Sequence, residues 1–158
     1  MTSTLDANVL LYASDASSPV HRRAAQFLDR LAEGPDLVYL FWPTIVAYLR
    51  LATHPAVFDH PLSLEEALRN IDQLLARPHI QSPGEQPRFW DRFRSVVVEA
   101  GASGNLVSNA HLVALMREYG VRTIWTRDRD FRRFDGIEAR DPFAEGPSNG
   151  FRRRSAGR

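Results

Sequence analysis

The chain has 158 residues, of which 44% are hydrophobic and 25% charged, so one compact domain is expected rather than two. No apolar run approaches the roughly 20 residues that a membrane span needs. The N-terminus lacks the basic region and apolar core of a signal peptide. Cysteine is absent, which excludes disulfide scaffolds and thiolate metal sites and favours a reducing, cytoplasmic location.

The charge composition gives a weak indication of partners. The net charge is only +1, so bulk electrostatics do not predict a nucleic-acid binder. All 20 basic residues are arginine, whose planar guanidinium suits phosphate recognition. Codon usage in a GC-rich genome is the simpler explanation, and the two can coexist.

Strand and helix patterns alternate along the first half of the chain. Apolar residues at 9–11 follow a first short strand, and Asn8 is a plausible N-cap for the helix after it. Pro43 fits the first turn of a later helix. The predicted elements are strands at 2–6 and 37–41, a helix after Asn8, a helix at 20–32 and a helix from Pro43 to His54-Pro55.

The second half continues the alternation. Ser63, with Glu66 three residues later, has the pattern of a capping box at a helix start. Aromatic residues at helical spacing follow the Pro83-Gly84 turn. The predicted elements are a helix from Ser63 to about Pro78, a short strand at 79–81, helices at 86–100 and 105–119, and a strand at 121–126.

This alternation predicts an α/β sandwich with a mostly parallel central sheet. In such sheets ligands bind beyond the carboxyl ends of the strands, and Asp6 and Asp128 both occupy that kind of position. From Ala144 the composition turns to Gly, Pro, Ser, Asn and Arg. Residues 1–143 are therefore expected to form the domain, and 144–158 a disordered arginine-rich tail.

Acidic residues near this edge are candidates for a cation site. Mg²⁺ binds oxygen ligands, usually one or two carboxylates with water and phosphate. Asp6, Asp128 and Asp130 are the candidate ligands. Aspartate is also common in turns and at helix N-termini, where it caps backbone N–H groups, and that role would account for any one of them alone.

Five segments carry a family resemblance that covers residues 2 to 143. Leu5-Asp6-Ala7-Asn8-Val9-Leu10-Leu11-Tyr12 resembles the opening segment of PIN domains, and Trp125-Thr126-Arg127-Asp128-Arg129-Asp130-Phe131 their last acidic motif. Gly104-Asn105-Leu106-Val107-Ser108-Asn109-Ala110-His111-Leu112 resembles the segment in which a catalytic aspartate precedes Ala-His-Leu. Phe41-Trp42-Pro43 and Leu49-Arg50-Leu51-Ala52-Thr53-His54-Pro55 resemble an actinobacterial and mycobacterial subgroup of PIN-domain ribonuclease toxins of the VapC kind.

The resemblance implies a PIN-like α/β/α sandwich over residues 1–143. It also implies the toxin of a toxin–antitoxin system: a Mg²⁺- or Mn²⁺-dependent endoribonuclease that cleaves structured RNA such as tRNA or rRNA. A cognate VapB-type antitoxin and homodimerisation are implied partners. The matching positions are Asp6 and Asp128 as metal ligands, Asp130 as a secondary acidic position, and Asn8 and Thr126 as polar neighbours that orient the carboxylates.

Two positions depart from the family pattern. Asn109 stands where the resemblance implies a catalytic aspartate, and Ala47 where many PIN domains have a glutamate. Asparagine keeps an oxygen but loses the negative charge, so metal affinity should fall. An engineered inactivation, a natural degenerate copy and a site that tolerates the change all remain open.

The arginines around the last acidic motif have two interpretations. Arg127, Arg129 and Arg132 flank the proposed site and are candidates for binding RNA phosphates, although such a cluster is often only a solvated face. His111 is interpreted as a packed or hydrogen-bonded histidine. Trp90 and Phe93 are interpreted as core or dimer contacts rather than base-stacking platforms, and a homodimer is expected because the aromatic faces around Trp90 and Phe89 exceed the needs of a small core.

Two other classes of function are considered. A non-catalytic PIN domain that binds RNA or an antitoxin is the main alternative, and Asn109 is the feature that favours it. A Rossmann-like regulator that handles phosphate is disfavoured, because neither G-x-G-x-x-G nor G-x-x-x-x-G-K-[ST] follows the first strand.

Overall fold

The computed structural model describes residues 1–144, and the tail from residue 145, predicted to be disordered, lies outside the described residues. The strands are β1 (Ser3–Leu5), β2 (Val38–Tyr39), β3 (Ile80–Gln81), β4 (Thr123–Trp125) and β5 (Glu138–Arg140). The helices are α1 (Ala7–Ser14), α2 (His21–Glu33), α3 (Trp42–Ala52), α4 (Leu64–Leu75), α5 (Phe89–Ala100) and α6 (Asn105–Glu118), with a 3₁₀ helix η1 (Arg129–Arg133).

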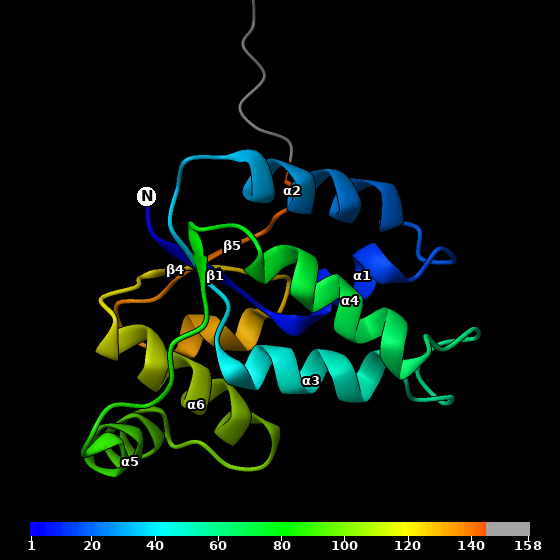
Figure 1. Cartoon of the computed structure of the whole chain (residues 1–158). Helices are drawn as coiled ribbons and strands as arrows, with labels where there is room; N and C mark the ends of the chain where they lie inside the picture. The colour runs from blue at the N-terminus through cyan, green and yellow to red at the C-terminus, as the bar shows by residue number, and fades with distance from the viewer. Residues whose placement is uncertain (145–158) are drawn as a thin grey trace, which may run out of the picture.

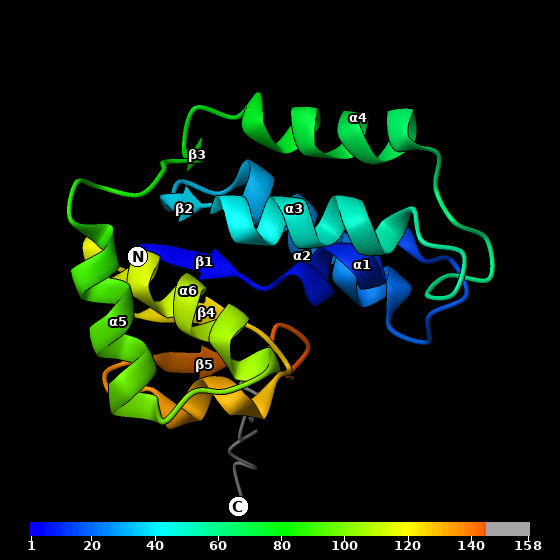
Figure 2. The same ribbon diagram turned by 90° about the horizontal axis from the view of Figure 1, so that it is seen from below.

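The strands form one sheet in the order β3-β2-β1-β4-β5, which can be followed in Figure 2. Each neighbouring pair is parallel; Ser3 of β1, for example, pairs with Val38 of β2 on one side and Thr123 of β4 on the other. All carboxyl ends therefore lie at one edge of the sheet. This confirms the predicted α/β class with a parallel sheet.

Successive strand residues point to opposite faces of the sheet, and helices cover both of these faces. Leu5 and Val38 join one buried cluster, to which α1, α2, α3 and α4 contribute. Ile124 and Tyr39 face a second cluster, built on α5, α6 and η1. Figure 1 shows α2 above the strands and α5 and α6 below them. Within residues 1–144, no helix has the length and hydropathy that a membrane span requires.

Local sequence signals set several helix boundaries. The Ser63 hydroxyl accepts a hydrogen bond from the Glu66 N–H at 3.1 Å, and the Glu66 carboxylate accepts one from the Ser63 N–H at 2.8 Å. This is the predicted capping box. Pro43 lies in the first turn of α3, also as predicted. Gly101 ends α5 with φ 56°, a conformation that side-chain-bearing residues rarely adopt, and so allows the chain to turn into α6.

Some predicted boundaries were wrong. Asn8 is not the N-cap of α1, because the helix begins at Ala7 and Asp6 occupies the cap position. The helix predicted from residue 86 begins at Phe89, since Arg88 has a left-handed backbone with φ 69°. Strand β5 was not predicted; its Glu138-Ala139-Arg140 sequence is an exposed edge without an apolar run.

Candidate active site

Asp6 follows β1 directly and presents its carboxylate at the carboxyl edge of the sheet. Its backbone is extended (φ −79°, ψ 150°), and although it holds the cap position of α1 its side chain makes no capping hydrogen bond. The Asp6 N–H donates to the Trp125 carbonyl at 3.0 Å, which fixes the residue against β4. Asn8 Nδ2 lies 3.5 Å from Asp6 Oδ2, so it is a weak neighbour of the carboxylate.

Thr126 connects the two aspartates that end β1 and β4. Its hydroxyl donates to Asp6 Oδ2 at 3.0 Å and accepts from the Asp128 N–H at 2.9 Å. Thr126 is 3% exposed, so water does not compete for these bonds. The hydroxyl has one proton, and the acceptor role toward Asp128 leaves that proton for Asp6.

Asp128 uses its two oxygens differently. Oδ1 accepts a hydrogen bond from the Asp130 N–H at 2.9 Å and so caps η1. Oδ2 accepts from Asn109 Nδ2 at 3.1 Å, and Asn109 comes from the first half of α6. The structure thus brings Asp6, Asn109 and Asp128 together at one edge of the sheet, although their chemical roles stay predictions.

The electrostatics of this group favour a cation. Burial raises the pKa of Asp6 above its ordinary value, and the nearby Asp128 carboxylate raises it further. The hydrogen bond from Thr126 and the nearness of the backbone N–H groups of Asn8 and Ala7 lower the same pKa. A carboxylate whose charge is disfavoured by burial and by a neighbouring carboxylate is stabilised when a positive ion binds beside it.

The donor set fits Mg²⁺ better than a cation that needs an all-protein cage. Within residues 1–144, no three His, Asp or Glu side chains gather into a group that could hold a metal ion. The exposed Asp130 therefore does not join Asp6 and Asp128, despite its place in the sequence motif. Two carboxylates with one amide suit Mg²⁺, which usually completes its six ligands with water and phosphate oxygens.

Thr44 supports the site and was not identified from the sequence. It is 3% exposed, and its hydroxyl donates to the Leu5 carbonyl at 3.1 Å, one residue before Asp6. This bond ties the first turn of α3 to the end of β1. A threonine directly after Pro43 at a helix start was the available signal. Ala47, one turn further along α3, brings no carboxylate.

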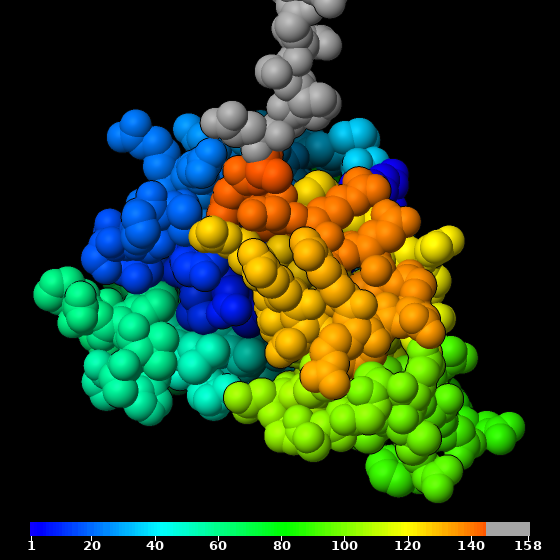
Figure 3. Space-filling model, turned by 180° about the vertical axis from the view of Figure 1, so that it is seen from behind, coloured from blue at the N-terminus to red at the C-terminus, as the bar shows by residue number. Residues whose placement is uncertain are grey.

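The predicted RNA-binding arginines surround a polar hollow beside Asp128. The hollow has a volume of about 190 Å³. Figure 3 shows this face of the molecule, on which the gold segment around η1 lies next to the dark blue start of α1. The residues that line the hollow are Thr126, Arg127, Asp128, Arg129, Arg132, Ala139 and Asp141.

Comparisons with known proteins agree with this geometry. The PIN domain family model matches residues 4–137. Ribonuclease VapC48 of Mycobacterium tuberculosis is 48% identical over 144 residues, which cover 91% of this chain and 99% of that protein. The chain belongs to the PIN-domain family of VapC ribonucleases. Ribonuclease VapC37 of the same species is 36% identical, over 87% of this chain and 95% of its own length.

Solved structures of this family share the fold. VapBC2 from Rickettsia felis, bound to a DNA fragment from its promoter, matches with a TM-score of 0.63 and 13% identity, over 89% of this chain and 98% of that one. VapC20 of Mycobacterium tuberculosis, described as a sarcin-ricin loop cleaving toxin, matches with a TM-score of 0.62 and 14% identity, over 85% and 98%. At these identities the likeness supports the VapC fold.

His111, in the Ala-His-Leu segment, contacts residues outside the acidic site. His111 Nε2 lies 2.8 Å from Glu85 Oε1, and this hydrogen bond lowers the pKa of Glu85. The rings of Phe89 and Phe93 pack at 5.5 and 5.8 Å from the imidazole. His111 is therefore packed and hydrogen-bonded, as the sequence indicated, whereas Trp90 is 67% exposed and belongs to no core.

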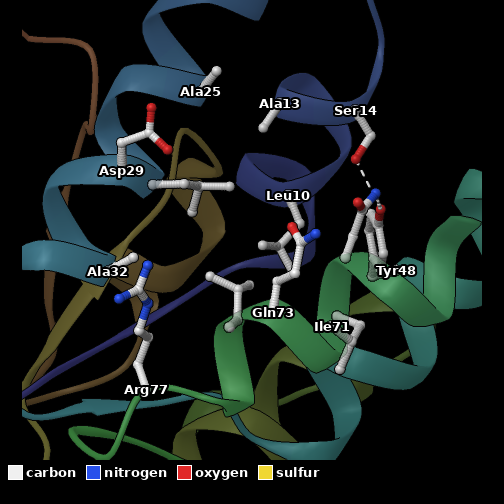
Figure 4. A pocket seen from close by; sticks show the side chains of 13 residues that line it. Leu10, Ala13, Ser14, Ala25, Asp29, Ala32, Tyr48, Ile71, Gln73 and Arg77 are labelled. Carbon is white, nitrogen blue, oxygen red and sulfur yellow. Dashed lines mark hydrogen bonds between the residues drawn. The ribbon is translucent and has the colours of Figure 1, made fainter.

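A second cavity of this VapC chain lies apart from the acidic site. It measures about 270 Å³ and is lined by residues of α1, α2, α3 and α4 and by Arg77 (Figure 4). At one end Asn70 Nδ2 donates to the Tyr48 hydroxyl at 2.9 Å, and Ser14 Oγ lies 2.8 Å from the same hydroxyl. None of the candidate catalytic residues lines this cavity.

Proposed function

We propose that this VapC ribonuclease hydrolyses RNA phosphodiester bonds with a divalent cation, Mg²⁺ or Mn²⁺, held by Asp6 and Asp128. One observation carries the proposal: the carboxylates that follow β1 and β4 are fixed by a single buried hydroxyl, that of Thr126, and burial and the nearby Asp128 carboxylate raise the pKa of Asp6. An arrangement that is unfavourable without a cation and geometrically fixed is suited to binding one.

The residues of the chain divide the work of the site. When bound, a divalent ion polarises the scissile phosphate and lowers the pKa of the attacking water. Asp6 and Asp128 hold the site's negative charge, and Thr126 keeps both carboxylates in orientation. Asn109 holds Asp128 Oδ2 and adds no charge, so we propose an activity weaker than an aspartate there would give.

We propose structured RNA, such as tRNA or rRNA, as the substrate and a VapB-type antitoxin as the protein partner. The partner is supported by the fold shared with VapBC2 of Rickettsia felis and with VapBC-1 of nontypeable Haemophilus influenzae. The toxin would act in the cytoplasm, where both RNAs are present. Co-expression with the product of a neighbouring short reading frame should give a stable complex with suppressed cleavage, and continued cleavage in its presence would refute this pairing.

We also propose a homodimer, with a contact surface that differs from the predicted one. Phe89 is packed against α6 and is not available, whereas Trp42 and Val46, one turn apart on α3, are 47% and 58% exposed. Trp90 is exposed on α5. Sedimentation at micromolar concentration should show a dimer, and Trp42→Ser should weaken it more than Trp90→Ser does. A monomer at that concentration would contradict the proposal.

The central test compares Asp6→Asn with the matched control Asp72→Asn, an exposed aspartate on α4. Calorimetric titration with Mn²⁺ should show binding to the unchanged chain and to the control, and none to Asp6→Asn. Cleavage of total tRNA and rRNA should need Mg²⁺ or Mn²⁺, stop with EDTA, and fall at least about 100-fold in Asp6→Asn. Equal metal binding by the two variants would refute the metal site.

A non-catalytic RNA-binding PIN domain is the second candidate, and Asn109 is the observation that favours it. Its amide donates a hydrogen bond to Asp128 Oδ2, so the position of this carboxylate does not depend on a bound cation. This alternative predicts RNA binding without cleavage at any Mg²⁺ or Mn²⁺ concentration. It also predicts that restoring a carboxylate at position 109 does not produce cleavage.

A further inference from the structure

The arginines around the polar hollow differ in whether an acidic side chain is paired with them. Arg129 and Arg132 both line the hollow, and neither has an ion-pair partner among residues 1–144. Both belong to η1, three residues apart. In a 3₁₀ helix residues three apart lie on the same side, so their guanidinium groups extend from one face of η1.

Arg127 is engaged elsewhere in the same hollow. Its Nε lies 3.8 Å from Asp141 Oδ2, and its guanidinium lies 5.7 Å from the centre of the Phe143 ring. Arg127 is therefore paired with an acidic residue. Arg127 thus forms part of the wall, while Arg129 and Arg132 supply the uncompensated positive charge.

We propose that Arg129 and Arg132 form a phosphate subsite that holds an RNA phosphodiester next to the one cleaved at Asp6 and Asp128. The hollow shares Asp128 and Thr126 with the acidic site, so a bound strand would continue from one into the other. The planar fork of each guanidinium can donate two parallel hydrogen bonds to the oxygens of a phosphate. The inference rests on the proposed function, since it assumes RNA as the substrate.

A nucleobase is a less suitable occupant of this hollow. Base recognition by a carboxylate and an arginine would need Asp141 and Arg127 to be free, and the two are paired with each other. Apart from Asp128, which belongs to the acidic site, the remaining charged residues of the hollow are Arg129 and Arg132, which suit a phosphate. The subsite should therefore contribute to affinity for any RNA sequence and should not select one.

The test measures RNA binding in EDTA, where cleavage is prevented. Fluorescence anisotropy with labelled 12-nucleotide oligo(U), oligo(A) and oligo(C) gives the Kd at several NaCl concentrations. Each phosphate contact to single-stranded RNA contributes about 0.7 to the slope of log Kd against log[NaCl], or about fivefold in affinity at 0.1 M salt. Arg129→Gln with Arg132→Gln should therefore lower the slope by about 1.4 and weaken binding about 25-fold, equally for all three sequences.

Arg133→Gln is the matched control, because Arg133 is exposed on the same η1 and does not line the hollow. It should leave the slope within about 0.3, and Arg127→Gln should do the same. Unchanged thermal unfolding of all variants shows that they are folded. If Arg133→Gln lowers the slope as much as Arg129→Gln, the cluster is a diffuse basic face and the subsite is refuted.

Further outcomes separate this inference from the proposed function. If the unchanged chain binds RNA with a salt slope that the double variant keeps, the subsite is refuted and the ribonuclease proposal stands. If inorganic phosphate binds through Arg129 and Arg132 while the Kd for RNA does not depend on either residue, the hollow is a site for free phosphate and the inference is overturned. If the unchanged chain neither binds nor cleaves RNA, both proposals fail together.

Discussion

The two halves of the acidic site are built in different ways. The strand half, Asp6, Thr126 and Asp128, is held by the buried hydroxyl of Thr126 and by the bond from the Asp6 N–H to the Trp125 carbonyl. The helix half contributes Asn109 from α6, through one side-chain bond of 3.1 Å to Asp128. The strand half is fixed by the sheet, whereas the helix half depends on side-chain chemistry alone.

This difference explains how the site accommodates an amide. Asn109 donates to Asp128, so the contact is favourable without any ion. An aspartate at the same position would place a third carboxylate about 3 Å from an Asp128 oxygen, and that arrangement requires a cation or a proton. The helix half therefore decides whether the site needs its metal in order to be stable.

Asn109→Asp should produce the largest effect. A third carboxylate should tighten Mg²⁺ binding and raise RNA cleavage about 10- to 1000-fold, since each ~1.4 kcal/mol of transition-state stabilisation changes the rate about tenfold. Paired cleavage assays on total tRNA and rRNA measure this. Asn105→Asp, at the exposed start of α6, is the charge-matched control and should change cleavage less than threefold. Equal activity of Asn109→Asp and the unchanged chain would show that position 109 is not part of the metal site.

Thr126→Val tests the strand half. It removes the donor to Asp6 and the acceptor for the Asp128 N–H, so it should lower cleavage about tenfold and the free energy of unfolding by about 1–3 kcal/mol. Thr44→Val is the matched control, because it removes another buried hydroxyl bond but leaves both carboxylates held. It should lose comparable stability with less than threefold loss of activity. Parallel losses of activity in both would mean that Thr126 acts only through stability.

Much of the fold was predictable because local signals and tertiary structure agree. The Ser63–Glu66 capping box and Pro43 set helix starts by local chemistry alone. Strand β5 was not predicted because Glu138–Arg140 has no apolar pattern of its own. Its pairing with β4 makes it a strand. The start of α5 was placed too early because the left-handed backbone of Arg88 cannot be read from its side chain.

The candidate site was predictable where residues follow strands directly. Asp6 and Asp128 could be placed at one edge because both come after parallel strands, and Thr126 because it lies two residues before Asp128 in the same motif. The pairing of Arg127 with Asp141 depends on β5 and could not be foreseen. Thr44 was missed because its bond to β1 spans 39 residues of sequence.

The raised pKa of Asp6 should also make the stability of the protein depend on pH. Because its pKa is raised in the folded state, the folded protein binds more protons than the unfolded chain between the ordinary value of 3.8 and the higher folded-state value. In EDTA, stability should therefore fall as the pH rises through that window and stay lower above it. Asp6→Asn should remove this dependence and raise the Tm at pH 7 by a few degrees.

Mg²⁺ should reverse the order of the Tm values of the unchanged protein and Asp6→Asn. Saturating Mg²⁺ stabilises only a chain that binds it, so the unchanged protein should gain Tm while Asp6→Asn should not. Thermal unfolding from pH 3.5 to 8, with EDTA and with Mg²⁺, measures both effects. A lower Tm for Asp6→Asn in EDTA at pH 7 would mean that the Asp6 charge is favourably paired in the folded protein.

Asp130→Ala should have the smallest effect, although Asp130 lies in the acidic motif. Its contribution to the strand half is made by its backbone, since the N–H donates to Asp128 Oδ1 at 2.9 Å, and alanine keeps that bond. Its exposed carboxylate joins no metal-binding group among residues 1–144. Cleavage and Mn²⁺ affinity should therefore stay within about twofold of the unchanged chain. Asp130→Pro removes the N–H and should lower cleavage more than Asp130→Ala does. A tenfold loss in Asp130→Ala would instead make the side chain a ligand, and the strand half would then extend into η1.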